Sequence, residues 1–311
     1  MPFSVSAAPH ITQKESTQSL MLDVVTALMP AVIAGVWLFG FAAARVVLLS
    51  VAFCVGFEYL YQKLAHKKIR INDLSAVVTG VIFALNLPPT APWWMILVGS
   101  LVAIVLVKQL FGGLGHNFMN PALAARAVLL ASWPVHMTAS NTASAFVTPF
   151  DAVSSATVLT PESAISGGVT MIDMLIGRMP GSIGEVCKIA ILIGLAYLLV
   201  KKVVTWHIPV VLLGTFMIFS ALFGQDPIAS VLSGGVLFGA VFMATDYVTS
   251  PMTRIGQCVY AFGAGLIIAV IRSFGSYPEG VTYGILLMNI ATPLIDRALR
   301  PKVYGEVKAN A

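Results

Sequence analysis

The chain has 311 residues, of which 58% are hydrophobic and only 10% are charged, and its formal net charge is +5. Soluble proteins carry about 25% charged residues, so this composition excludes a disordered chain and argues against a soluble globule. The three cysteines, Cys54, Cys187 and Cys258, stand far apart in apolar runs. Without a nearby cysteine or histidine partner, they predict neither a disulfide nor a metal site built by this chain.

Ten membrane-spanning helices are predicted from the apolar tracts. A helix needs about 20 largely apolar residues to cross the hydrocarbon core of a bilayer. The tract 74–107 is too long for one helix and carries Pro88, Pro89 and Pro92 at its centre. Because proline interrupts helices, we expect a hairpin of two spans there. The expected spans are 22–40, 44–62, 73–88, 92–108, 118–135, 184–200, 207–224, 229–246, 255–272 and 280–297.

The basic residues orient this bundle, because cytoplasmic loops of membrane proteins carry an excess of Lys and Arg. With both termini in the cytoplasm, 13 of the 18 Lys and Arg residues lie in cytoplasmic segments or at inner helix ends. The basic run 63–70 is then expected to anchor the inner leaflet rather than to bind nucleic acid. The polar segment 1–21 lacks the layout of a signal peptide and is expected to be cytoplasmic, as is the tail 298–311.

The long segment 136–182 lies outside the cytoplasm in this topology. It is rich in Ser, Thr, Gly and Ala, and loops of this length are usually functional or disordered. We therefore expect this loop to carry part of the function.

Short similarities five spans apart suggest an internal repeat. Thr79-Gly80 in the third span resembles Ser233-Gly234 in the eighth, and Met119-Asn120 at the fifth span resembles Met288-Asn289 in the tenth. A repeat of five spans must be inverted in the membrane, and such folds place their sites near the repeat interface, where Gly and Pro interrupt helices. The sequence therefore predicts two inverted five-helix repeats, similar to those of urea transporters, over residues 22–135 and 183–297.

The most specific short string is Asp151-Ala152-Val153-Ser154-Ser155-Ala156-Thr157. On composition alone it is a turn of small residues. The small side chains of Ser154, Ser155 and Ala156 also leave the backbone beside the Thr157 hydroxyl open to a modifying enzyme. Such an enzyme could join this hydroxyl to a phosphate as an ester, so a turn and a modification site are both open interpretations.

This string resembles the flavin-transferase acceptor motif Asp-x-x-Ser/Thr-Gly/Ser-Ala-Thr, in which FMN is attached through its phosphate to the last threonine. It departs from the commonest form only at Ser155, where most members have Gly. Nearly the whole chain is similar to the family that contains the D subunit of the Rnf ion-translocating oxidoreductase complex and the B subunit of the Na⁺-translocating NADH:quinone reductase. The segments that carry this resemblance are 21–30, 117–122, 277–280 and 293–296.

The resemblance implies a flavin-carrying subunit in the cell inner membrane, with covalent FMN on Thr157 on the outer side. Asp151, Ser154, Ser155 and Ala156 would complete the acceptor motif. Electrons would pass between ferredoxin and NAD⁺ through flavins and iron–sulfur centres, most of them on sister subunits, and would drive Na⁺ or H⁺ across the membrane. A flavin transferase would attach the FMN. The first span begins near residue 22, whereas the quinone-reductase subunit has a longer N-terminal region, so length favours the Rnf-type subunit.

Asn117 and Asn120 are candidates for a second, non-covalent flavin site. They lie three residues apart in a Gly-rich break between two spans, and Asn side chains offer the donors and acceptors that suit the pyrimidine edge of a flavin. The related quinone-reductase subunit is similar here at its non-covalent riboflavin site. A purely structural role is equally open, in which Asn120 caps the next helix and Pro121 occupies its first turn.

Ionisable residues inside spans are further candidates, because charge at membrane depth is costly. Asp246 lies at a predicted helix break, where carbonyl oxygens and a carboxylate suit Na⁺; an Asx turn that caps the break is the alternative. Glu58 in the second span is a candidate for the ion pathway. Glu58 and Arg126 are expected either to satisfy each other or to face a sister subunit.

Two other functions remain open at this stage. One is a component like the B subunit of the quinone reductase, and the other is a urea-transporter-like channel without redox function. The chain carries no P-loop, dinucleotide-binding fingerprint, nucleophile elbow or zinc spacing, so NAD⁺ and ferredoxin are expected to bind elsewhere in the complex.

Overall fold

The computed structural model describes residues 16–138, 171–177, 181–275 and 280–300, and every regular element in these ranges is a helix. The prediction of an all-helical fold is therefore confirmed for this part of the chain. The longer elements are α1 (Thr17–Phe39), α2 (Phe41–Leu64), α3 (Ser75–Leu85), α4 (Trp93–Leu101), η2 (Val102–Gln109), α5 (Pro121–Ser132), α9 (Lys188–Val200), α10 (His207–Leu222), α13 (Arg254–Phe274) and α14 (Gly280–Ala298). The shorter ones are η1 (Ile71–Asp73), α6 (Pro134–Thr138), α8 (Met171–Ile176), α11 (Pro227–Leu232), α12 (Val236–Phe238) and η3 (Gly239–Met243).

Three of these helices, α1, α2 and α13, are long and apolar enough to cross a membrane. The other apolar helices are shorter, including α3, α5, α9 and α10. These features support a membrane protein, while the number of ten spans stays a prediction.

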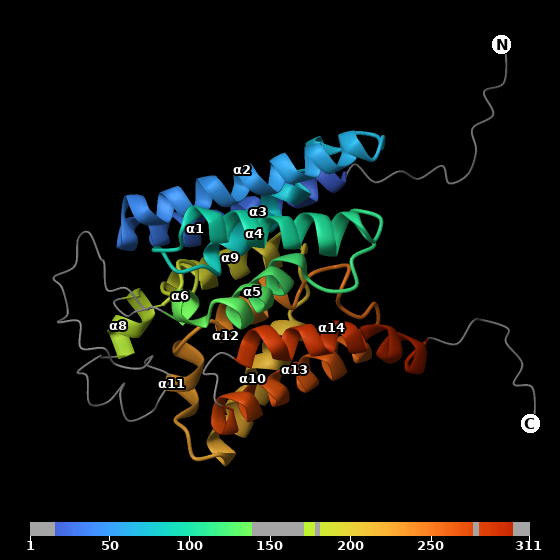
Figure 1. Ribbon diagram of the computed structural model, residues 1–311. Coiled ribbons are helices and arrows are strands. Elements are labelled where there is room, and N and C mark those ends of the chain that lie inside the picture. The colour runs from blue at the N-terminus through green and yellow to red at the C-terminus, as the bar shows by residue number, and fades with distance from the viewer. Residues whose placement is uncertain (1–15, 139–170, 178–180, 276–279, 301–311) are drawn as a thin grey trace, which may run out of the picture.

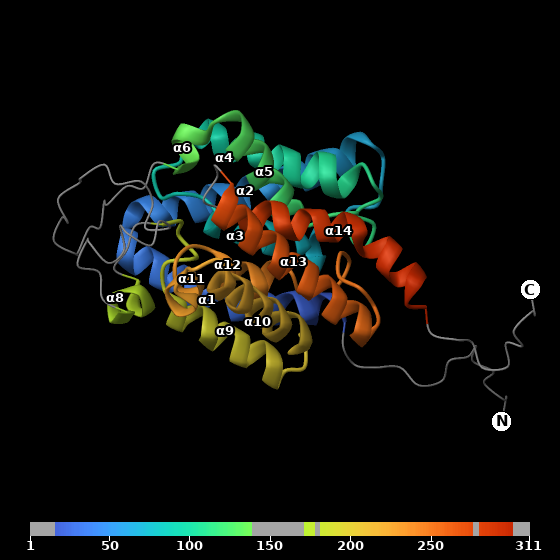
Figure 2. The ribbon, with the colours of Figure 1, turned by 90° about the horizontal axis from the view of Figure 1, so that it is seen from below.

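The helices form one bundle whose two ends differ (Figures 1 and 2). The beginning of α1 and the end of α14 lie at the same end, and α6 and α8 lie at the opposite end in both views. Within the bundle, α1 packs against α9, and α5 packs against α14. The two termini of the described helices therefore share one side, as the predicted topology requires.

The proline-rich break in the tract 74–107 is confirmed. Helix α3 ends at Leu85, and the chain becomes helical again only at Trp93, directly after Pro92. A distant segment forms hydrogen bonds to the end of α3 and the residues just after it. The backbone N–H groups of Ile183 and Gly184 donate to the carbonyls of Leu87 and Leu85. The bond to Leu85 satisfies a carbonyl that the helix end leaves without a partner.

The prediction of one continuous eighth span over 229–246 is wrong. The structure divides this stretch into α11, α12 and the π-helix η3. The interruption lies at Ser233-Gly234-Gly235, where Gly234 has a φ of 68°. This left-handed conformation is accessible to glycine but costly for other residues, so the helix stops there and a new one begins.

Capping residues move two other helix starts from their predicted positions. Ser16 and Ser19 form a reciprocal capping box, so α1 begins five residues before the expected position 22. The side chain of Asn120 accepts hydrogen bonds from the N–H groups of Ala122 and Leu123, and α5 begins at Pro121 rather than 118. The predicted capping role of Asn120 and the position of Pro121 in the first turn are thus confirmed.

Close contact between α1 and α9 depends on Gly194. A Cβ atom at this position would lie 2.4 Å from the backbone oxygen of Ala27 and 2.7 Å from the ring of Phe242. The backbone of α1 cannot yield as a flexible side chain would. We expect Gly194→Ala to destabilise the protein by about 1–3 kcal/mol, measured as a lower thermal unfolding temperature in detergent.

Gly214 is the matched control, because it also lies within a helix but has no atom within 4 Å of its built Cβ. Alanine is a better helix former than glycine, so Gly214→Ala should leave the unfolding temperature unchanged or raise it. Equal destabilisation by the two substitutions would contradict the packing argument.

Candidate functional site

The acceptor motif lies outside the described residues. Asp151, Ser154, Ser155, Ala156 and Thr157 all belong to the range 139–170, for which no structure is described. The remaining candidate residues, by contrast, lie on described elements.

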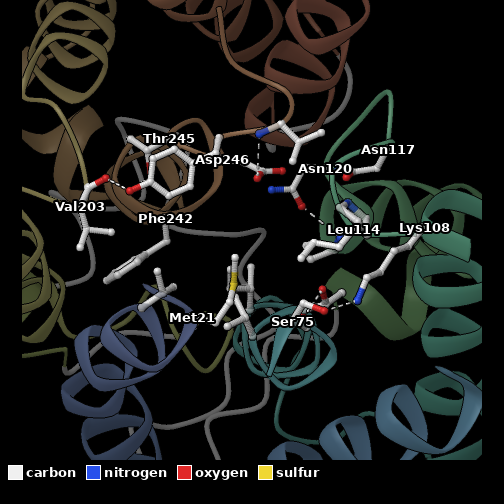
Figure 3. Close-up of a pocket in the computed structure, with 18 of the residues that line it drawn as sticks. Met21, Ser75, Lys108, Leu114, Asn117, Asn120, Val203, Phe242, Thr245 and Asp246 are labelled. Atoms are coloured by element: carbon white, nitrogen blue, oxygen red, sulfur yellow. Dashed lines mark hydrogen bonds between the residues drawn. The ribbon is translucent and has the colours of Figure 1, made fainter. Parts of the chain in front are cut away.

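The structure brings Asn117, Asn120 and Asp246 together in one pocket (Figure 3). Residues of α1, α3, η2, the start of α5, the end of α9, η3 and the segments that precede α5 and that follow α9 and η3 complete its wall. The cavity volume is about 120 Å³, and the pocket is partly open to its surroundings. Since Met21 near the start of α1 lines it, the pocket lies toward the end of the bundle where α1 begins. We call it the inner pocket.

The side chains of the inner pocket are unevenly distributed. Figure 3 shows Asn117, Asn120 and Asp246 grouped together, Lys108 and Ser75 on a second part of the wall, and Met21 and Phe242 on a third. The remaining lining is mostly apolar, with Val24, Val78, Ile82, Leu114, Leu198, Val203 and Val204 among its residues. The pocket therefore combines broad apolar surfaces with a few polar groups.

The Asn120 amide makes three hydrogen bonds within the fold. Besides capping α5, its Nδ2 donates to the backbone oxygen of Met243 at the end of η3 (3.3 Å). The Asn117 side chain has fewer partners. Its Nδ2 donates to the backbone oxygen of Met119 (3.2 Å), and the side chain interacts with the Asp246 carboxylate. Asn117 is thus the better placed of the two amides to contact a ligand.

Asp246 stabilises the turn that follows η3. Its carboxylate accepts from the N–H of Val248 (3.4 Å) and from the hydroxyl of Thr249 (3.2 Å). This is the local bonding expected of an Asx turn. The residue also lines the inner pocket, so a structural role and a contact with a bound species are compatible.

Glu58 forms a buried ion pair with Lys108, and the expectation that it would pair with Arg126 or face a sister subunit is wrong. Its Oε2 lies 2.9 Å from Lys108 Nζ, while Gln109 and Gln62 donate to its Oε1 at 2.7 and 3.3 Å. The exposed fractions are 1% for Glu58 and 2% for Lys108. Every oxygen of this carboxylate therefore has a partner, which a buried charge requires.

Lys108 is the charged residue of the pocket that the sequence patterns did not predict. It ends an apolar tract, where a lysine is ordinarily an anchor at the membrane surface, and its partner is 50 residues away in the chain. The only local signal is that Lys108 and Gln109 together follow a long apolar run. That signal does not identify Glu58 as the partner of Lys108.

Arg126 instead binds the end of α3. Its guanidinium donates to the Asn86 side-chain oxygen, and the Asn86 amide nitrogen donates to the carbonyl of Ile82 (2.7 Å) and contacts the sulfur of Met243 (3.4 Å). This chain of contacts joins α5 to the C-terminal ends of α3 and η3. Those ends carry partial negative charge, which a buried arginine compensates.

Comparison with known proteins places the chain in a family. The NQR2, RnfD, RnfE family matches residues 4–305. The D subunit of a Na⁺-translocating ferredoxin:NAD⁺ oxidoreductase complex from Acetobacterium woodii is 50% identical over 98% of this chain and 96% of its own length. The D subunit of a proton-translocating ferredoxin:NAD⁺ oxidoreductase complex from Clostridium ljungdahlii is 42% identical over 97% and 96%. The D subunit of an ion-translocating oxidoreductase complex from Halorhodospira halophila is 36% identical over 98% and 96%.

These relatives are ion-translocating oxidoreductase subunits, and their similarity extends over nearly the full length of both chains. The match includes the residues of the inner pocket and the helices that build it. The chain therefore belongs to the NQR2, RnfD, RnfE family.

Proposed function

We propose that this chain is the flavin-carrying membrane subunit of a ferredoxin:NAD⁺ oxidoreductase complex that couples electron transfer to ion translocation. The observation that carries the proposal is the 50% identity over 98% of the chain to the D subunit from Acetobacterium woodii. The coupling ion is Na⁺ or H⁺, because the Acetobacterium and Clostridium relatives differ in this respect. Sister subunits of the complex and the lipid bilayer are its partners.

Covalent FMN on Thr157 is the first cofactor of this proposal. The string 151–157 matches the acceptor motif, and its small residues beside Thr157 leave room for a flavin transferase. The described neighbours of this segment, α6 and α8, lie at the end of the bundle opposite the start of α1 (Figure 1). That arrangement supports an FMN on the outer side of the inner membrane.

A non-covalent flavin, riboflavin in the simplest case, is the second cofactor. A flavin ring has two broad apolar faces and one edge of hydrogen-bonding groups. The inner pocket offers a matching surface, with Phe242 and Leu198 on its apolar wall and Asn117 among its polar groups. The residues present therefore fit the group, and Asn120 contributes by fixing the start of α5.

The two flavin sites would then lie toward opposite ends of the bundle. Electrons that pass between them would cross the membrane, while ferredoxin and NAD⁺ both bind on cytoplasmic sister subunits. Flavin supplies the redox chemistry, and the protein determines its position, its potential and its exclusion from water. Such a crossing offers a physical route to coupling with ion movement.

The arrangement of helices supports ten spans in two inverted five-helix repeats. Contacts across the two halves join α1 to α9 and α5 to α14. The third and eighth spans also have a similar contact, since a basic residue donates to a serine in each: Lys108 to the hydroxyl of Ser75 (2.6 Å) and Arg272 to the backbone oxygen of Ser233 (3.2 Å).

A first prediction concerns the covalent FMN. The protein, co-expressed with a flavin transferase, should give a fluorescent band under ultraviolet light after denaturing electrophoresis, and Thr157→Ala should abolish it because the acceptor hydroxyl is gone. Thr160→Ala is the control, because it removes a hydroxyl three residues outside the motif and should leave the band unchanged. A dark wild-type band would contradict the covalent site.

A second prediction concerns the inner pocket. Asn117→Ala should lower the amount of extractable flavin several-fold while covalent FMN stays intact, because the pocket loses its least committed amide. The double variant with Asn120→Ala should lower it further, since the start of α5 also loses its cap. Asn72→Ala, which changes an exposed asparagine in η1, is the control. Unchanged extractable flavin in Asn117→Ala would make that residue purely structural.

A third prediction concerns Asp246 and the ion. If its carboxylate takes part in ion binding, Asp246→Asn should weaken the Na⁺ dependence of ferredoxin:NAD⁺ electron transfer by the purified complex. Asp226→Asn is a matched control, because Asp226 caps α11 at an exposed position and asparagine caps equally well. Identical Na⁺ titrations for wild type and Asp246→Asn would reject the role.

A further inference from the structure

Lys108 is held at the wall of the inner pocket by two fixed acceptors. Its Nζ donates to Glu58 Oε2 (2.9 Å) and to Ser75 Oγ (2.6 Å). The Ser75 hydroxyl proton is committed to Asp73 Oδ1 (2.7 Å), so the lone pairs of that oxygen are left for Lys108. The ammonium group is therefore tethered from two sides by groups that are themselves fixed.

One donor of this ammonium has no acceptor among the described residues. A lysine ammonium has three N–H donors, and two of them have partners among the described residues. Lys108 also lines the inner pocket (Figure 3). Burial of a donor without a partner costs free energy, and the pocket is where a bound molecule can supply the missing acceptor.

The charges of the pocket wall are asymmetric. Lys108 and Asp246 are the two charged side chains among the described lining residues. The Asp246 carboxylate already accepts from Val248, Thr249 and Asn117. Of these two charged side chains, Lys108 is therefore the one that can donate a hydrogen bond to a ligand.

We propose that Lys108, positioned by Glu58 and Ser75, donates its third N–H to the flavin in the inner pocket and so favours the reduced, anionic form of that flavin. This inference rests on the flavin site proposed above. Uptake of two electrons and one proton leaves a flavin with one negative charge on its ring, which a neighbouring ammonium stabilises relative to the neutral oxidised ring. Charge near the ring nitrogens is one of the means by which proteins change the reduction potential of a bound flavin.

Glu58 acquires a defined role in this arrangement. With Gln62 and Gln109 donating to its Oε1, its other oxygen is oriented toward Lys108 and keeps the ammonium in place. Glu58 and Ser75 are positioning residues, whereas Lys108 contacts the ligand.

The test compares retention of riboflavin by the purified complex under oxidising conditions and after reduction with dithionite. Bound riboflavin is extracted after gel filtration and quantified separately from covalent FMN. The variant is the double substitution Lys108→Met with Glu58→Gln, because removal of the lysine alone would leave a buried, unpaired carboxylate. Lys201→Met is the control, since Lys201 also faces a carboxylate, Asp23 at 3.7 Å, but does not line the pocket.

Wild type and Lys201→Met should retain reduced riboflavin more tightly than oxidised riboflavin. The double variant should bind oxidised riboflavin as wild type does but lose about tenfold of the preference for the reduced form, equivalent to about 30 mV for a two-electron couple. Lys108→Arg keeps the charge and should keep most of the preference, which provides a second variant if the double substitution prevents assembly.

Two contrary results have separate meanings. If the double variant retains the full preference, or if Lys108→Arg loses it completely, the role of Lys108 is wrong and the flavin site stands. If wild type binds riboflavin in neither redox state, the flavin site itself is wrong, and the role assigned to Lys108 is overturned with it.

Discussion

The need to satisfy every polar group within an apolar bundle governs this structure. An unpaired backbone carbonyl or buried charge is costly where water is absent, yet regular helix stops at the ends of α3 and η3 and leaves such groups there. A distant segment supplies hydrogen-bond donors at each end: the N–H groups of Gly184 and Ile183 donate at the end of α3, and the Asn120 amide donates at the end of η3. The interruptions are therefore stable only in the assembled bundle.

The inner pocket lies where α3 begins and η3 ends. Polar residues gather there as caps and turn formers. Asn120 and Asp246 both have structural duties at such ends. The same requirement explains the Glu58–Lys108 pair, since a lysine brought to this depth needs a counter-charge.

The sequence predicts the helices well, because apolar tracts between charged residues are a strong signal. It predicts their ends less well: the glycine break at Gly234 lies inside an apolar tract and resembles a tolerated glycine. Asn117, Asn120 and Asp246 could be named from their positions at helix breaks, but their convergence depends on packing between residues more than 120 positions apart. The partnership of Glu58 with Lys108 has no local signal, because it depends on how α2 packs against η2. The acceptor motif ending at Thr157 lies outside the described residues, so its role still rests on its sequence.

The π-helical geometry of η2 sets the direction of Lys108. Here the N–H of Leu110 bonds to the carbonyl of Val105, five residues back instead of four. Relative to an α-helix, such a segment contains one extra residue, and each residue of a helix accounts for about 100° of rotation. Deletion of a single residue between Trp93 and Lys108 would turn the lysine away from Glu58 by about that angle. The exact residue count of this span is thus under constraint.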